Sequence, residues 1–323
     1  MSFLVRRLGA AAILAFGLGV SAQAAQYPSQ PIKLITAFGP GSASDIVARL
    51  IAERLQTRLG QVVIVENRPG ASGQVATDMV ARAQPDGYTI MLATNTTHSS
   101  NPYLFKSLRY DPIKDFTPLV QVCNFPFVLV VSGKLPVANV QELRRYGQEH
   151  PDKINYAYGN STGQISAASF DKQTGMRAAA IPYKSTPQAM TDIIGGRATF
   201  MFVDLASAAG QIQSGSLKAL AVTTEKRSAL APELPSISES LGQPGVDLAA
   251  WVGIFGPAGL PAAVRDRLAA ELYAVVASDE VKNKLSHMGA EPTPARADDF
   301  RAFVSRQLKV WGEKVSQSGI QPE

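Results

Sequence analysis

The sequence is poor in the side chains that hold metals or form covalent cross-links. Its 323 residues include one cysteine, Cys123, and three histidines, His98, His150 and His287. A single cysteine excludes an intrachain disulfide framework and a cysteine-based metal site. The histidines lie far apart and in no metal-ligand spacing, which argues against a zinc enzyme. We therefore expect neither a metal nor a cofactor.

An excess of charge of one sign is also missing. Charged residues make up 18% of the chain, and 31 Lys and Arg residues against 26 Asp and Glu residues leave a net charge of +5. The basic residues form no cluster of the kind that contacts nucleic acid, so no nucleic-acid partner is expected. Hydrophobic residues make up 46%, which excludes a disordered chain. A chain of this length exceeds what one core usually supports, so it predicts two lobes.

The first 24 residues have the anatomy of a secretory signal peptide. Arg6 and Arg7 form a basic start, residues 8–20 carry no charge, and Ala22-Gln23-Ala24 supplies a small-x-small cleavage pattern. The apolar run is shorter than the roughly 20 residues of a membrane-spanning helix. An uncleaved anchor is the alternative, although such anchors usually lack the cleavage pattern. The sequence thus predicts a periplasmic protein that is cut near Ala24.

Buried strands and amphipathic helices alternate along the rest of the chain. Strand patterns occur at 32–38, 62–66, 88–93, 127–131, 154–158, 179–183, 199–203, 217–223 and 252–255. Helical patterns occur at 46–55, 74–83, 140–148, 264–276 and 300–315 and after residue 160, whereas 232–245 is rich in Pro and Gly and predicts a connection. This order predicts βαβ units with parallel sheets in two α/β lobes. The expected division is 25–124 plus 225–323 for the first lobe and 125–224 for the second.

Two glycine-rich turns are candidate anion sites. Residues 39–45 (GPGSASD) and 67–73 (NRPGASG) each join a predicted strand to a helix start. Glycine permits close backbone approach, and the first N–H groups of a helix have no internal partner, so each turn can present donors to an anion. Ordinary turn chemistry is the alternative for either turn. Neither matches a nucleotide motif, because both lack GxGxxG and a terminal Gly-Lys-Ser/Thr.

Several longer runs resemble one family of receptors. The runs PIKLITAFGPGSASDIVAR, VVIVENRPGASGQVA, PDGYTIMLAT, IPYKSTPQAMTDIIGGRATFMF and WVGIFGPAGLP are similar, in this order, to the Bug receptors of tripartite tricarboxylate transport systems. The resemblance implies a type II periplasmic binding protein, a Venus-flytrap of two doubly wound Rossmann-like lobes with a ligand cleft between them. It implies a solute-binding protein, not an enzyme, that captures a small carboxylate by lobe closure and delivers it to a membrane permease. We expect a monomer whose two glycine-rich turns grip the carboxylate, partly through ordered water.

The expected ligand-binding residues come from both lobes. In the first lobe they are Phe38, Gly39, Gly41, Ser42, Ala43, Asp45, Arg68, Gly70, Ala71, Ser72, Gly73, Thr94 and His98. In the second lobe they are Ser161, Thr162, Gly163, Lys184, Ser185, Thr186 and Asp204. The helix after residue 160 departs from the family, which carries a His and a Glu where this chain has Gln164 and Ala168. That side of the cleft is therefore expected to carry less charge.

Three of these residues have an alternative interpretation. Asp45 falls in the first turn of a predicted helix, where it is expected to brace the loop rather than touch the anion. Arg68 either pairs with the ligand or is solvated. His98, in the predicted loop at 94–102, either reaches the cleft mouth or is bonded locally.

A serine hydrolase is the alternative function. Residues 159–163 (GNSTG) match G-x-S-x-G between a predicted strand and helix, and Ser161, Asp204 and His287 follow in the order of a triad. No HGG-type turn precedes Ser161, however, and His287 falls in a helical stretch rather than in a loop after a strand. A triad needs convergent geometry and not order alone. Ser161 is therefore interpreted as a hydroxyl and N–H donor to the ligand.

The predicted signal peptide leads to a direct test of processing. Mass spectrometry of the secreted protein should show an N-terminus at Ala25 or within a residue or two of it, because the small-x-small pattern ends at Ala24. An intact Met1 together with retention in the membrane would favour the anchor instead.

Overall fold

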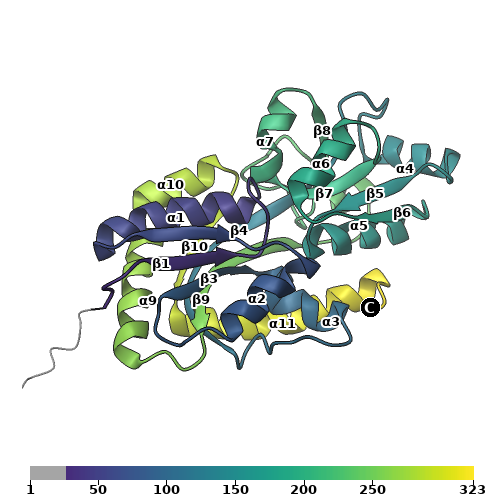
Figure 1. Cartoon of the computed structure of the whole chain (residues 1–323). Helices are drawn as coiled ribbons and strands as arrows, with labels where there is room; N and C mark the ends of the chain where they lie inside the picture. Colours follow the sequence, from purple (N-terminus) through teal and green to yellow (C-terminus); the bar gives the residue numbers. More distant parts are fainter. Residues whose placement is uncertain (1–26) are drawn as a thin grey trace, which may run out of the picture.

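The described chain folds into two lobes, each with a central sheet flanked by helices (Figure 1). The computed structural model describes residues 27–323, so the predicted signal peptide at 1–24 lies outside the described residues. Within that range, no helix has both the length and the apolar character that crossing a bilayer requires.

The first lobe holds most of the chain. Its strands are β1 (Ile32–Thr36), β2 (Val63–Asn67), β3 (Thr89–Thr94), β9 (Ala249–Pro257) and β10 (Glu291–Arg296). Its helices are α1 (Ala43–Leu59), α2 (Gln74–Ala81), α3 (Asn101–Leu104), α9 (Ala262–Val276), α10 (Asp279–His287) and α11 (Ala297–Ser318). A 3-10 turn, η1 (Ala71–Gly73), precedes α2, and a π-helical turn, η2 (Thr96–Ser100), precedes α3.

The second lobe is smaller and is built in the same way. Its strands are β5 (Asn155–Tyr158), β6 (Ala179–Pro182), β7 (Phe200–Asp204) and β8 (Leu217–Val222). Its helices are α4 (Val140–Glu149), α5 (Ser161–Thr174), α6 (Thr186–Ile194) and α7 (Leu205–Gln213), and a short helix, α8 (Ile237–Leu241), follows β8 along the chain.

Strand β4 (Phe116–Ser132) runs through both lobes. Over residues 116–126 it pairs with β9, with β10 on its other edge, and from Phe127 onward it pairs with β7 and β8. The returning chain lies beside this change of partners, because the Thr223 N–H donates to the Phe127 carbonyl at 2.8 Å and the Thr223 hydroxyl donates to the Leu248 carbonyl at 2.5 Å. One continuous strand therefore joins the two sheets.

The first sheet is covered on both faces, which is why its strands are apolar at consecutive positions. In β3, Ile90 and Leu92 belong to the apolar cluster that includes α1, α9 and α10. Met91 and Ala93, on the opposite face, belong to the cluster that includes α2 and α11. Figure 1 shows α1 and α10 on one side of this sheet and α2, α3 and α11 on the other. This is the doubly wound arrangement that the sequence predicted.

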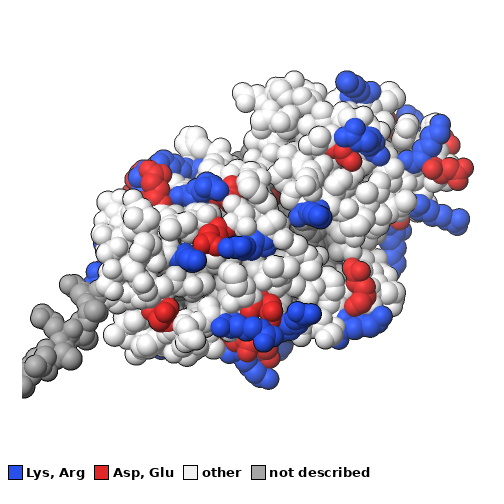
Figure 2. Space-filling view, viewed as in Figure 1, with Lys and Arg blue, Asp and Glu red and all other residues white. Residues whose placement is uncertain are grey.

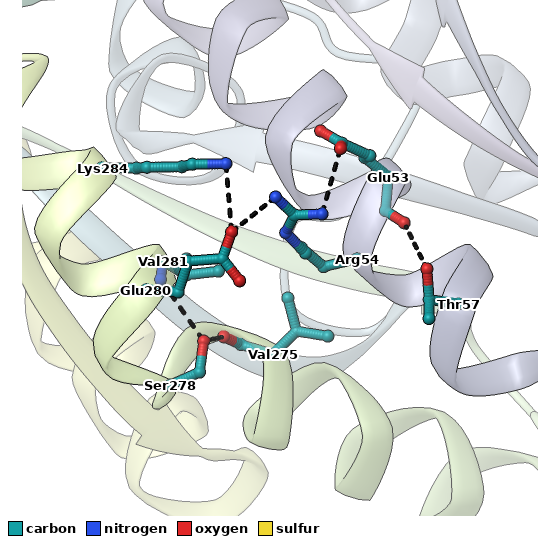
Figure 3. A network of polar contacts seen from close by, with 8 residues as sticks. All are labelled: Glu53, Arg54, Thr57, Val275, Ser278, Glu280, Val281 and Lys284. Carbon is teal, nitrogen blue, oxygen red and sulfur yellow. Dashed lines mark hydrogen bonds and ion pairs between the residues drawn. The ribbon is translucent and has the colours of Figure 1, made fainter.

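Ion pairs connect α1 to α10 on the outer surface of the first lobe (Figure 3). Arg54 of α1 donates to Glu280 of α10 at 2.5 Å and to Glu53 at 3.0 Å, and Lys284 lies 3.2 Å from Glu280. The hydrogen bond from Lys284 is the main reason that the pKa of Glu280 lies below its usual value. Exposed pairs of this kind contribute little to stability, so the buried apolar contacts beneath them, such as those of Val281, hold the helices together. Figure 2 shows the same mixing of charge, with basic side chains interspersed among acidic ones on the face drawn.

The parallel strands expected from the sequence are present in both lobes, but neither sheet is parallel throughout. Strands β1, β2 and β3 are parallel, as are β5, β6 and β7. Strands β9 and β10 run antiparallel to β4, and β4 also runs antiparallel to β7 and β8. Because the chain passes from one sheet to the other along β4 and returns along β9, these two strands must run in opposite directions.

The sequence patterns missed several elements, among them η2, α3, the first part of β4, strand β10 and helix α8. Strand β10 has the sequence EPTPAR, and its two prolines argue against a strand in a sequence pattern. Proline is nevertheless tolerated where a strand forms a sheet edge. Helix α8 lies within the stretch 232–245 that was expected to be only a connection. It begins because the Ser236 hydroxyl accepts from the Glu239 N–H at 3.0 Å.

The position of α8 bears on the division into lobes. The helix packs against α4 and β8, and Gln141 of α4 donates to the Ser240 carbonyl at 2.7 Å. The expected boundary at 224/225 precedes this helix. We therefore propose that the second lobe extends through α8 and that the chain returns to the first lobe where β9 begins.

The packing of α11 leads to a test of the fold. Phe300 is fully buried, and its ring centre lies 4.9 Å from that of Phe255 and 5.8 Å from that of Trp251. Phe300→Ala should lower the free energy of unfolding by about 3–5 kcal/mol, because it removes a buried aromatic ring. Phe303→Ala, on the same helix but half-buried, is the matched control and should have a smaller effect. Urea unfolding midpoints measure the stability of both variants. Equal losses of stability would contradict the assignment of Phe300, and not Phe303, to the buried face of α11.

Candidate functional site

A cavity of about 270 Å³ lies between the two lobes. The first lobe lines it with Ala37, Phe38, Gly70, Ala71, Ser72, Gly73 and Glu323. The second lobe lines it with Tyr158, Gly159, Asn160, Gln164, Pro182, Tyr183 and Lys184. A molecule in this cavity therefore contacts both lobes, which is the arrangement that couples binding to closure.

The turn after β2 has a strained backbone. Its φ angles are all positive, at 140° for Gly70, 45° for Ala71, 51° for Ser72 and 84° for Gly73. Side chains rarely adopt such angles, and residues held in them gather at functional sites. The turn is held by the Asn101 amide, which donates to the Ser72 carbonyl at 3.0 Å. The hydrogen bonds of residues 27–323 leave the N–H groups of Ala71 and Ser72 without a protein acceptor, so both can donate to an anion.

The turn after β1 is braced by Asp45. Its carboxylate accepts from the Gly41 N–H at 3.0 Å and from the Asn67 amide at 3.0 Å, and it lies 2.9 Å from Arg49. Burial alone would raise the pKa of Asp45, but the hydrogen bonds from Arg49, Gly41 and Asn67 outweigh it and lower the pKa below its usual value. Asp45 braces the loop as predicted. Since Asn67 ends β2, the same carboxylate also ties the two glycine-rich turns together.

The opposite wall of the cavity comes from turns that follow β5 and β6. Asn160 begins α5 by accepting from the Gly163 N–H at 2.8 Å, and its amide donates to the Thr186 hydroxyl at 3.1 Å. Lys184 is exposed and forms no ion pair with any residue of 27–323, so its charge is available to a ligand. The lobes approach closely here, because a Cβ atom on Gly39 would lie 3.3 Å from the Cβ of Ser185.

A second, smaller cavity adjoins the first. Its volume is about 30 Å³, and its lining includes Ser42, Ala43, Ser44, Asn160, Thr162, Thr186 and Asp204. That volume and these polar groups suit an ordered water, which needs about 10–15 Å³ and two to four partners. Asp204 begins α7 by accepting from the Ser207 N–H at 2.8 Å, and burial raises the pKa of its carboxyl group.

The structure brings together about half of the expected site residues. Those that line one of the two cavities are Phe38, Ser42, Ala43, Gly70, Ala71, Ser72, Gly73, Thr162, Lys184, Thr186 and Asp204. Those that line neither are Gly39, Gly41, Asp45, Arg68, Thr94, His98, Ser161, Gly163 and Ser185. Of these, Arg68 pairs with Glu66 at 2.7 Å.

His98 does not lie at the cleft mouth. It is fully buried, with its ring centre 4.2 Å from that of Phe255 and 4.6 Å from that of Phe116. Burial lowers the pKa of His98 to about 3, so the imidazole is neutral. Because the Thr97 hydroxyl donates to the Thr94 carbonyl, His98 Nδ1 is the donor in its 2.9 Å contact with Thr97. The local bond that was the alternative for His98 is therefore observed, and what the sequence did not indicate is burial, because a run of polar residues predicts an exposed loop whereas this run forms η2 and is buried.

Ser161 has no triad partner among residues 27–323. Its hydroxyl is buried, donates to the Thr96 hydroxyl at 2.9 Å and lies 2.5 Å from the Ser100 hydroxyl. His287 lies on the exposed surface of α10, where its Nδ1 contacts the Asn283 carbonyl at 2.7 Å. The order of residues that suggested a hydrolase therefore does not correspond to a catalytic geometry.

Several lining residues had not been expected. Asn160 carried a signal, because Asn followed by a helical pattern predicts a helix start. Gln164 had been singled out only as a departure from the family, and it lines the larger cavity, whereas Ala168 does not. Tyr158, Tyr183 and Glu323 carried no local signal. No group of three His, Cys, Asp or Glu side chains within the described part of the chain is arranged to hold a metal ion.

Comparisons with known proteins agree with this geometry. The model of the tripartite tricarboxylate transporter family receptor matches residues 47–320. A UPF0065 protein of Bordetella bronchiseptica is 36% identical over 304 residues, covering 94% of this chain and 90% of the relative. The structure of R. palustris Rpa4515 with adipate matches with a TM-score of 0.88 at 32% identity, covering 92% of this chain and 100% of the other. The structure of the periplasmic binding protein BugD matches with a TM-score of 0.86 at 34% identity, covering 92% and 100%. This chain therefore belongs to the tripartite tricarboxylate transporter receptor family and is a Bug-type periplasmic solute-binding receptor, not an enzyme.

Proposed function

We propose that this receptor captures a small carboxylate by closing its lobes over it and delivers it to a membrane permease. The observation that carries the proposal is the larger cavity, lined on one side by the strained turn 70–73 and on the other by Lys184. The adipate in the structure of Rpa4515, a protein 32% identical to this chain, supports a carboxylate as the ligand class.

The two walls have different parts in the proposed capture. Backbone N–H groups of Ala71 and Ser72 donate to the carboxylate, while Lys184 supplies the only positively charged side chain among the described residues that line the cavity. Charge-assisted hydrogen bonds are about twice as strong as neutral ones, so the acid is preferred over a neutral analogue. Because the ligand contacts both lobes only when they are closed, its binding increases the closed population.

Two further features belong to this proposal. We propose that an ordered water occupies the smaller cavity beside Asp204 and takes part in holding the ligand. The receptor acts as a monomer, since one chain supplies both walls of the cavity.

The glycine turn leads to a comparison of two neighbouring positions. Gly73 has a φ of 84°, and a Cβ atom there would lie 2.8 Å from Cγ2 of Thr97 and 3.0 Å from the Cβ of Ala37. Gly73→Val should therefore displace the turn and weaken carboxylate binding at least about 100-fold, whereas Ser72→Ala keeps the N–H and should change it less than about threefold. Calorimetry measures both, with a melting curve to show that each variant is folded. Equal losses in two folded variants would contradict backbone recognition.

The charge of the ligand and of Lys184 can be tested together. Replacing adipate by its diamide removes charge-assisted bonds worth about 1.5–3 kcal/mol each, so two of them at the low end of that range already amount to roughly a hundredfold in affinity. Lys184→Gln should weaken the binding of the acid about tenfold or more and leave the amide unaffected. Titration calorimetry on the four combinations gives the coupling between the two changes. Equal affinity for acid and amide would exclude the proposed carboxylate grip.

A further inference from the structure

Eight consecutive polar residues, 94–101 (TNTTHSSN), are buried at the junction of the lobes. None of them is more than 6% exposed. The middle of the run forms η2, and π-helical turns of this kind are rare and occur often at functional sites. The run packs against the start of α5 in the second lobe. Burying so many polar groups stabilises a core poorly, so the run requires another explanation.

Three hydrogen bonds cross from this run to α5. The Asn95 amide donates to the Thr162 hydroxyl at 2.7 Å. The Ser161 hydroxyl donates to the Thr96 hydroxyl at 2.9 Å, so its single proton is used. The Ser161 hydroxyl also lies 2.5 Å from the Ser100 hydroxyl, which donates within its own turn to the backbone carbonyls of Asn95 and Thr96 at 3.2 Å each. The hydroxyls of Ser100, Ser161 and Thr96 therefore lie in consecutive hydrogen-bond contact, and the bonds of such a network strengthen one another.

We propose that these five residues, Asn95, Thr96, Ser100, Ser161 and Thr162, form a hydroxyl latch that positions the second lobe for capture and sets how much of the ligand-free receptor is closed. The latch lies beside the cleft, because Asn160, the residue before Ser161, lines both cavities. Its inner end also approaches the crossing strands, because Thr162 lines the smaller cavity together with Phe127 and Ala250. Since its two halves belong to different lobes, opening of the lobes separates them. This inference rests on the proposed function only in that capture uses closure, since the latch bonds themselves involve no ligand.

The polar character of the latch keeps the two states close in free energy. On opening, each hydroxyl and amide exchanges its partner for water, whereas an apolar contact of the same area would resist exposure. The closed state also leaves the side-chain oxygen Oδ1 of Asn95 buried without a partner among the described residues, although the nitrogen of the same amide donates to Thr162. Water can satisfy that oxygen once the lobes separate. Because the open and closed forms then differ little in free energy, a ligand can shift the receptor to the closed form even when its affinities for the two forms differ only modestly.

A latch has a signature that a ligand contact lacks. The apparent dissociation constant equals the intrinsic one divided by the fraction of competent closed receptor. Weakening the latch therefore lowers the affinity for every ligand by the same factor. A residue that touches the ligand would instead affect ligands differently, according to the group each presents to it.

The first experiment compares two buried serines on the same helix. Ser161→Ala removes two latch bonds and should weaken adipate, succinate and glutarate by one common factor of about 2 to 20. Ser166→Ala is the matched control, because the Ser166 hydroxyl is buried without a partner among the described residues, and it should leave all three affinities within about twofold. Factors that differ among the three diacids, or an equal loss in the control, would overturn the latch.

The second experiment needs no ligand. In the pair Ser100→Cys with Ser161→Cys, the two sulfurs replace hydroxyls that lie 2.5 Å apart across the lobes. Oxidation should cross-link the lobes and give a ligand-free radius of gyration, measured by X-ray scattering, no larger than that of the reduced protein, with adipate exchange slowed at least tenfold. Failure to cross-link, or unchanged exchange after cross-linking, would overturn the proposal. If no diacid binds at all, the proposed function fails, while the cross-link still reports whether the two halves of the latch meet.

Discussion

The continuous strand β4 is the constraint on which the rest of the structure depends. Its first part pairs with β9 and β10 and its last part with β7 and β8, so each lobe is held by its own sheet while the change of partners falls at Phe127. Within each lobe the parallel strands end at the same cleft. The turns after β1 and β2 and the turns after β5 and β6 therefore meet across one cavity, as binding sites of α/β sheets usually do.

The cavity is built largely from backbone. The left-handed turn at 70–73 leaves N–H groups free, and its strain of about 1–3 kcal/mol for each such non-glycine residue must be offset by bonds elsewhere. Asn101 supplies one of these bonds, and Asp45 holds the neighbouring turn through Gly41 and Asn67. The Asp45 carboxylate already accepts hydrogen bonds from Gly41 and Asn67. It therefore does not compete with an anionic ligand for the N–H groups of the turn at 70–73. Among the charged side chains around the site, Asp45 is a brace, Glu323 lines the cavity as an acidic residue, and Lys184 is the cation that remains available.

The junction of the lobes combines an apolar and a polar half. His98 is neutral and stacks on Phe255, so it belongs to the apolar core of the first lobe. Two residues away, Thr96 and Ser100 face the second lobe through hydroxyl contacts with Ser161. The same π-helical turn therefore anchors firmly in one lobe and contacts the other through groups that water can replace. This asymmetry suits a contact that must form and break many times without loss of the fold.

Local sequence patterns were sufficient to predict the elements whose conformation depends on residues close to them in the sequence. The apolar run of β3, the helical spacing of α1, the two glycine turns and the bond from Gly41 to Asp45 all depend on residues a few positions apart, so the sequence alone determined them. It could not place Ser161, whose hydroxyl partners lie more than 60 positions away in the other lobe. Nor could it show that the polar run 94–101 is buried or that Glu323 lines the cavity. A hydroxyl group or a carboxylate has the same local sequence signal in water and in a lobe interface, and only the packing of one lobe against the other decides which surroundings it has.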